Sequence, residues 1–151
     1  MTVVALASAL WVGLGAAQAQ PQPDFFWPHG VVQAGGANID PTVQPVIAFV
    51  RGTSCGSSTT KLATAGPDVP AADVGKTVYV VDVLADGSGA GQRAGCGRAG
   101  DPVTFWFPQI RRMAVQEPVF KVGQARADLD ASRSLGERRV LPQVSTDGPL
   151  Q

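Results

Sequence analysis

The clearest strand signal in the chain is the segment Thr77-Val78-Tyr79-Val80-Val81-Asp82-Val83-Leu84. Most of its residues are β-branched or aromatic, and such residues favour extended backbone. Successive side chains of a strand point to opposite faces, so Tyr79, Val81 and Val83 would share one apolar face. The segment therefore predicts a strand over residues 77–84 that buries this face against a second layer.

The same two-residue alternation recurs in residues 45–51, 103–107 and 124–132. The apolar positions on one face are Val46, Ala48 and Val50, then Val103, Phe105 and Phe107, then Ala125, Ala127, Leu129 and Ala131. The alanines of the third segment favour a helix by propensity, but a helix would scatter these side chains around its circumference. We therefore predict three further strands, of which 124–132 is the last in the domain.

Glycine and proline occur at short intervals along the chain, which contains 18 glycines and 12 prolines. Their frequency opposes long helices and favours short strands joined by turns. Weaker strand signals lie at residues 57–62 and at 113–122, where Pro118 would interrupt the pairing. Together these signals predict an all-β fold, a two-layer antiparallel β-sandwich of about seven strands, of the immunoglobulin-like or prealbumin-like type.

Composition divides the chain into four segments. Residues 1–19 are interpreted as a secretory signal peptide, because an apolar run of about 15 residues ends in the small-x-small sequence Ala17-Gln18-Ala19. The alternative is a membrane anchor, for which this run is short against the roughly 20 residues of a span. Residues 20–24 would form an extended leader, 25–131 the β-sandwich domain, and 132–151 a flexible C-terminal tail. We expect a secreted, periplasmic or cell-surface protein whose mature chain has no membrane span.

Two cysteines, Cys55 and Cys96, are present, and in an exported chain a pair of cysteines indicates one disulfide. Glycines beside both residues allow the close backbone approach that such a bond requires. A metal site would lack ligands, since the chain has a single histidine, His29, and no Cys-x-x-Cys spacing. We therefore expect a disulfide, no metal and no cofactor.

The charge balance argues against a nucleic-acid partner. The 12 basic and 12 acidic residues give a formal net charge of zero, without the basic excess of nucleic-acid-binding domains. Basic residues are nevertheless concentrated between Arg93 and Arg139. This concentration indicates either a mildly basic face or, as we favour, solvated arginines on outward strand positions.

Several segments, taken in order, resemble one known type of domain. They are His29-Gly30-Val31-Val32, Val46-Ile47-Ala48-Phe49-Val50-Arg51-Gly52, Cys55-Gly56, Tyr79-Val80-Val81-Asp82-Val83, Gly95-Cys96-Gly97, Gly100-Asp101-Pro102-Val103-Thr104-Phe105 and Ala127-Asp128-Leu129. Their order resembles the carboxypeptidase-regulatory-like, transthyretin-like (prealbumin-like) β-sandwich domains of bacterial extracellular proteins. The insertion at residues 67–76 departs from that pattern. The resemblance implies a domain carried by surface or secreted proteins and without catalysis of its own.

One stretch of the chain matches a catalytic-serine pattern. Residues 52–56 match the G-x-S-x-G pattern, with Ser54 as the nucleophile and His29 as the only histidine able to act as base. In hydrolases that pattern joins a strand to a helix, whereas here a Ser/Thr-rich strand is expected after it. We therefore expect no catalytic residues.

Aromatic and arginine side chains are the candidates for ligand or partner contact. Phe25, Phe26 and Trp27 cluster at the start of the domain, and Trp106 would point away from its inward neighbours. Exposed aromatic rings stack on sugars or dock another protein, although such residues more often cap a sandwich core. Arg111 and Arg112 would serve an anionic partner or mark an exposed turn. The sequence therefore favours a non-catalytic structural or adhesive module that contacts other surface proteins or polysaccharide, and the alternative is a small carbohydrate- or ligand-binding domain.

Overall fold

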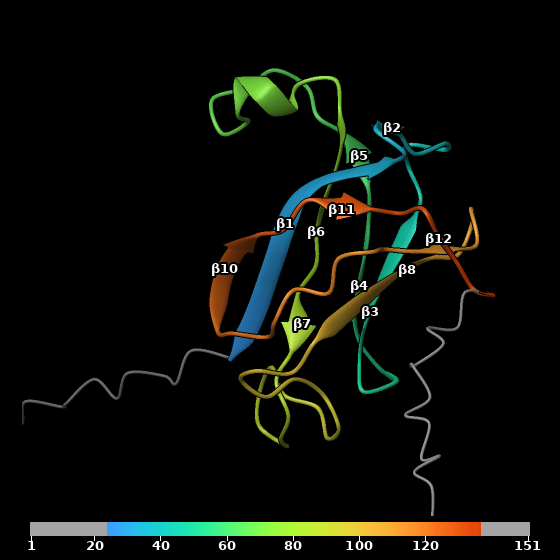
Figure 1. The fold of residues 1–151 in the computed structure, drawn as a ribbon. Coiled ribbons are helices and arrows are strands. Elements are labelled where there is room, and N and C mark those ends of the chain that lie inside the picture. Colours follow the sequence, from blue (N-terminus) through green and yellow to red (C-terminus); the bar gives the residue numbers. More distant parts are fainter. Residues whose placement is uncertain (1–23, 137–151) are drawn as a thin grey trace, which may run out of the picture.

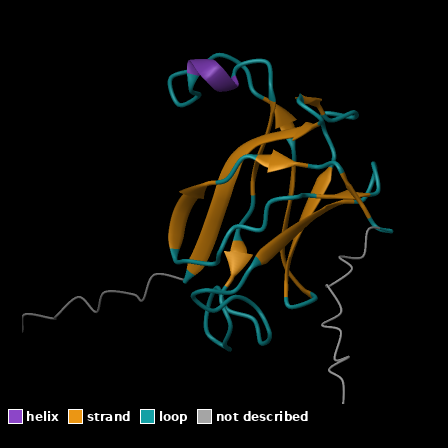
Figure 2. Cartoon of the chain, in the orientation of Figure 1, coloured by secondary structure: helices purple, strands orange, loops and turns teal. Residues whose placement is uncertain are grey.

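Two β-sheets pack face to face in the computed structural model, which describes residues 24–136 (Figure 1). The predicted all-β, two-layer sandwich is therefore confirmed. The expected signal peptide at 1–19, most of the leader and the tail beyond residue 136 lie outside the described residues. Within the described part, one short 3₁₀ helix, η1 (Ala71–Asp73), accompanies the strands (Figure 2).

Each sheet is built from a few longer strands and several short ones. The first sheet has the order β10 (Gly123–Arg126), β1 (Phe25–Ala34), β6 (Thr77–Val80) and β5 (Lys61–Leu62), and β1 also pairs with β2 (Ala37–Asn38), β7 (Val83–Leu84) and β11 (Leu129–Asp130). The second sheet has the order β12 (Arg133–Ser134), β9 (Arg112–Met113), β8 (Val103–Phe107), β3 (Pro45–Val50) and β4 (Thr53–Thr59). The sandwich therefore has more strands than the seven or so that the sequence predicts, and several of them are only two residues long.

The core lies between the sheets and contains the alternating side chains that the sequence predicts. The buried set includes Val46, Ala48, Val50, Tyr79, Val81, Val83, Val103, Phe105 and Phe107. Tyr79 meets Phe105 edge to face, with ring centroids 5.5 Å apart. Its hydroxyl donates a 2.7 Å hydrogen bond to the Ala127 carbonyl, and burial raises the pKa of this phenol. Each buried face therefore packs against the other layer, as the periodicity requires.

The longest strand, β1, lies at the centre of the first sheet and was not predicted as a strand. Pro28 and Gly30 interrupt its sequence, and both residues are uncommon inside strands. β1 pairs antiparallel with β6 and parallel with β10 and β11. Pairing between the named strands is therefore antiparallel except where β1 meets β10 and β11.

The predicted strand at 124–132 is divided into two strands, β10 and β11. The break has a local cause: the Asp128 carboxylate accepts the Val31 N–H at 2.9 Å, where a regular ladder would use a backbone carbonyl. Alternation of exposure nevertheless continues, with Leu129 and Ala131 buried. This segment is not the last strand, because β12 follows it and pairs with β9. The predicted domain boundary at 131 and tail from 132 are therefore wrong by at least three residues.

The chain changes sheets between β4 and β5. The strand predicted at 57–62 is two strands, since β4 pairs with β3 in the second sheet and β5 pairs with β6 in the first. Buried Thr60 occupies the crossing point, where its N–H donates to the Gln44 carbonyl at 2.9 Å. Of the predicted broken strand at 113–122, only Met113, in β9, belongs to a strand.

Candidate functional site

The outer face of β1 carries three aromatic side chains in alternation. Phe25, Trp27 and His29 are partly exposed, whereas Phe26 and Pro28 between them are buried. Phe25 and Trp27 stack with ring centroids 6.0 Å apart and an interplanar angle of 28°. Because β1 is paired along both edges, these rings have cross-strand neighbours on both sides: Gln124 and Arg126 on β10, Val80 on β6 and Leu84 on β7.

A hollow of about 390 Å³ opens beside Trp27, and we name it the Trp27 hollow. Its other walls are His29, Val80, Asp82 and Gln124. Strand register explains this set: Trp27 pairs with Gln124 on β10, and His29 pairs with Val80 on β6. The Val81 N–H donates to the Pro28 carbonyl at 3.2 Å, which brings Asp82 alongside Trp27. An indole face is therefore bordered by an amide on one side and a carboxylate on the other.

A second hollow of about 380 Å³ adjoins the first, and we name it the Leu62 hollow. His29 and Val80 line both hollows. Most of the rest of its wall comes from β5, β6 and the loop at 63–76 that carries η1, including Lys61, Leu62, Asp68, Val69, Pro70 and Val78. Gly30 of β1 and Arg126 of β10 complete the wall. Figure 1 shows this loop beyond the end of the first sheet, on the opposite side from the glycine-rich loop at 85–101.

An ion pair fastens the 63–76 loop to β10. The Arg126 guanidinium donates to both carboxylate oxygens of Asp73, at 2.8 and 2.9 Å, and lies 3.0 Å from Asp128. The hydrogen bond from Arg126 lowers the pKa of Asp73 and raises that of Arg126 itself. Two parallel N–H···O bonds fix geometry as well as charge. The loop is therefore held in one position beside the two hollows.

Trp106 lies on the other side of the molecule, on the outer face of the second sheet. It pairs with Ile47 on β3 and with Met113 on β9, so aliphatic neighbours flank it. It lines neither of the two hollows. The two tryptophans singled out in the sequence are thus on opposite faces, and only Trp27 borders a hollow described here.

Arg111 and Arg112 lie at the turn between β8 and β9. Both are exposed, and Arg111 has a positive φ of 54°. Arg112 donates to the Ser132 carbonyl at 3.1 Å, which joins the turn to the segment before β12. The pair therefore lies at an exposed turn, away from Trp27.

Three arginines in the described part of the arginine-rich stretch lie in ion pairs. Arg98 pairs with Asp86, Arg126 with Asp73, and Arg133 with Glu117 at 2.8 Å. These pairs lie on different elements, and each neutralises its own arginine. These three arginines are therefore ion-paired, where the sequence favoured solvated arginines on outward strand positions.

Ser54 and His29 lie in different sheets, on β4 and β1. The His29 Nδ1 lies 3.3 Å from the Trp27 carbonyl, and the Ser54 carbonyl accepts a 3.1 Å hydrogen bond from Arg93. Among residues 24–136, no hydrogen bond joins Ser54 to His29. Within the same residues, no group of three or more His, Cys, Asp or Glu side chains is placed to hold a metal ion.

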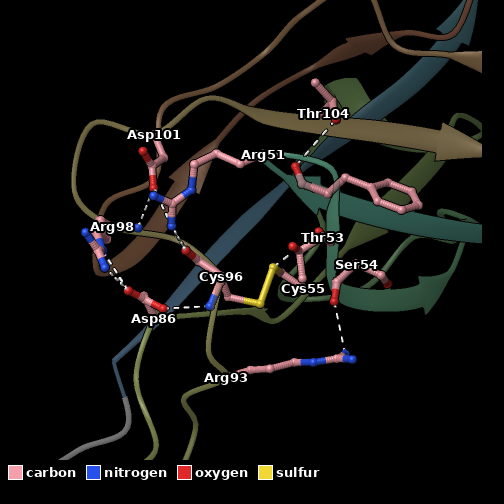
Figure 3. The surroundings of a disulfide bond; sticks show 12 residues. Arg51, Thr53, Ser54, Cys55, Asp86, Arg93, Cys96, Arg98, Asp101 and Thr104 are labelled. Atoms are coloured by element: carbon pink, nitrogen blue, oxygen red, sulfur yellow. Dashed lines mark hydrogen bonds and ion pairs between the residues drawn. A yellow bond between two sulfur atoms is a disulfide. The ribbon is translucent and has the colours of Figure 1, made fainter.

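The predicted disulfide joins Cys55 on β4 to Cys96 in the glycine-rich loop (Figure 3). Its two Cα atoms are 5.5 Å apart, and both residues are buried. Arg51 supports the loop from the β3–β4 turn, since it donates to the Cys96 carbonyl at 2.8 Å and lies 3.6 Å from Asp101. A disulfide is compatible with an extracytoplasmic location.

Asp86 organises the polar side of this loop (Figure 3). Its carboxylate accepts the Gly95 N–H at 2.7 Å and the Arg98 Nε–H at 2.6 Å. These two donors lower the pKa of Asp86 below its ordinary value of 3.8. The carboxylate thus ties the start of the loop to the residue before Cys96.

We expect the wild-type protein to lose stability in acid more steeply than an Asp86→Asn variant. A carboxylate with a lowered native pKa stabilises the fold above its unfolded pKa, and this contribution is lost as the pH falls through the native value. The difference between the two proteins should therefore shrink from about pH 4 downward. Thermal unfolding midpoints measured across this range test the prediction. Asp68→Asn, at an exposed position, is the control and should retain the wild-type slope.

The surroundings of Trp27 were only partly predictable from sequence. Trp27 was identified as a candidate, but Asp82, Gln124 and Val80 were not named as its neighbours. Their proximity depends on strand register between segments far apart in the chain. The one available signal was the alternation of Phe25, Trp27 and His29, which places these residues on one face of an extended segment.

These features define a class of protein, a disulfide-linked β-sandwich domain with an aromatic hollow on the outer face of its first sheet. Comparison with family models, curated proteins and solved structures found no match to the chain. In residues 24–136, no helix has both the length and the apolar character needed to cross a membrane.

Proposed function

We propose that this protein is an exported, non-catalytic β-sandwich module that adheres to a neutral glycan through the Trp27 hollow. One observation carries the proposal: a partly exposed indole forms the wall of an open hollow and lies between a side-chain amide and a carboxylate. Trp106 has an aliphatic setting instead, which makes Trp27 the better candidate for ligand contact.

The chemistry around Trp27 suits a sugar ring. One side of a pyranose ring presents C–H groups that pack on an aromatic face, while its hydroxyls need donors and acceptors at the edge. Gln124 supplies both, and Asp82 supplies a strong acceptor. With its proton on Nδ1, His29 donates to the Trp27 carbonyl and leaves Nε2 as a further acceptor. The Asp82 charge would repel an acidic sugar, so we favour a neutral glycan.

Export and the absence of catalysis are supported by separate features. The disulfide and the apolar sequence at residues 1–19 favour an oxidising compartment outside the cytoplasm. Ser54 and His29, which a serine hydrolase would bring together, lie in different sheets. The sequence resemblance to carboxypeptidase-regulatory-like domains, which are without catalysis of their own, also favours a non-catalytic module.

We expect the exported protein to bind insoluble cellulose, chitin or mannan, and Trp27→Ala to weaken that binding at least about tenfold. The substitution removes the stacking surface while the residue's backbone pairing in β1 remains. Depletion of the protein from solution, measured over a range of polysaccharide amounts, gives the affinity. Polygalacturonate, an acidic polymer, should bind more weakly than the neutral glycans.

Trp106→Ala is the matched control and should bind as the wild type does. Unfolding curves of both variants verify that they remain folded. The proposal is wrong if none of the three neutral glycans retains the wild-type protein, or if the two tryptophan variants lose binding equally.

A further inference from the structure

We propose that the ligand is an extended glycan chain that continues from the Trp27 hollow into the Leu62 hollow. This inference rests on the proposed function and specifies the length and path of its ligand. The two hollows adjoin, because the side chains of His29 and Val80 line both. A chain that stacks on Trp27 therefore has the Leu62 hollow directly in its path.

The dimensions suit several consecutive sugar units. β1 and β5 are separated by β6, and Lys61 pairs with Val78, which in turn pairs with Val31. Lys61 thus lies two strands across the sheet and four residues along it from Trp27. Ideal strand geometry makes this diagonal about 16 Å, which exceeds the size of a single sugar ring.

Apolar and polar residues both line the Leu62 hollow. Leu62 and Val80 are 45% and 48% exposed. Exposed apolar side chains grouped at one hollow indicate an interaction site. Lys61 and Asp68 on the same wall supply a donor and an acceptor for hydroxyl groups. The Leu62 hollow therefore resembles the Trp27 hollow in combining apolar and polar groups, but its apolar groups are aliphatic.

The wall of the Leu62 hollow is preorganised. The 63–76 loop closes on itself through hydrogen bonds from Ala63 N–H to the Lys76 carbonyl and from Gly75 N–H to the Ala63 carbonyl, both 2.8 Å long. The paired hydrogen bonds between Arg126 and Asp73 hold the same loop to β10. A wall that is already fixed avoids the entropic cost of ordering it when the ligand binds.

Binding of short and long oligosaccharides tests this path. We expect the wild type to bind chitohexaose, cellohexaose or mannohexaose at least about tenfold more tightly than the corresponding disaccharide. Leu62→Asp should remove most of this advantage and leave the disaccharide affinity unchanged. Val122→Asp, at a 64% exposed valine that lines neither hollow, is the matched control and should alter neither affinity. Isothermal titration calorimetry measures all of these affinities.

The outcomes separate this inference from the proposed function. Equal wild-type affinity for the disaccharide and the hexasaccharide, or a length advantage that survives in Leu62→Asp, would overturn the extended path while leaving the Trp27 site intact. Absence of binding at every length would overturn the proposed function itself. If unfolding curves show that Leu62→Asp does not fold, Leu62→Ala replaces it, with the same direction of effect expected.

Discussion

Replacing Cys55 and Cys96 together by alanine is expected to lower the free energy of unfolding by about 4 kcal/mol. The bond joins residues 41 positions apart, and the chain-entropy model gives this value for a loop of that length. Small domains are stable by only about 5–15 kcal/mol, so the loss is a large fraction of the total. The glycine-rich loop would keep its other attachments, among them the hydrogen bonds of Asp86, Arg51 and Arg93.

Urea unfolding of the oxidised wild type, the reduced wild type and the double-alanine variant measures this effect. The reduced protein and the variant should unfold at similar urea concentrations, well below that of the oxidised protein. Mass spectrometry of the purified protein with and without reductant reports the state of the thiols independently. An oxidised protein no more stable than its reduced form would contradict the expected contribution of the bond.

Gly56→Ala is expected to destabilise the fold by about 3 kcal/mol, at the upper end of the usual cost of overpacking. A methyl group at Gly56 on β4 would overlap the carbonyl oxygen of Asp82 and press against Val81. The obstacle is backbone, which has no alternative rotamer. The substitution would therefore force β4 away from the segment between β6 and β7, where the edges of the two sheets meet.

Gly66→Ala is the matched control, because its nearest neighbouring atom, the Thr64 carbonyl oxygen, would lie 4.0 Å from the added carbon. That variant should unfold within a few tenths of a kcal/mol of the wild type. Because Asp82 borders the Trp27 hollow, Gly56→Ala should also weaken glycan binding. Equal stability of the two variants would show that β4 does not pack closely on residues 81–82.

The strands that sequence predicted correctly are those whose buried face is visible within the segment itself. Residues 45–51 and 103–107 alternate between core and surface side chains, so local pattern was sufficient. Residues 77–84 alternate in the same way, but the predicted single strand is divided into β6 and β7, because residues 81–82 belong to no strand. β1 was not predicted because it contains Pro28 and Gly30, which are uncommon inside strands, and because aromatic residues on both of its faces hide the alternation of apolar and polar residues. β12 comprises only two residues, and its pairing with β9 leaves no sequence period.

The candidate site was less predictable than the fold. Alternation alone does not distinguish Trp27 from Trp106 as a candidate for ligand contact, since each would be an outward tryptophan on a strand. What distinguishes them is the identity of their cross-strand neighbours, Gln124 and Asp82 for one and Ile47 and Met113 for the other. Those neighbours follow from register between distant segments, which local pattern does not encode.

The parallel pairing of β1 with β10 and β11 has a consequence for how the chain acquires its structure. Val31 and the Asp128 carboxylate that receives its N–H are 97 residues apart in sequence. The central strand of the first sheet therefore lacks these partners until nearly the whole domain has been synthesised. Contacts of such long range slow folding into the millisecond-to-second regime. Until those residues arrive, β1 can pair only with segments nearer to it in sequence, such as β2, β6 and β7, so the first sheet is completed last on its β10 side.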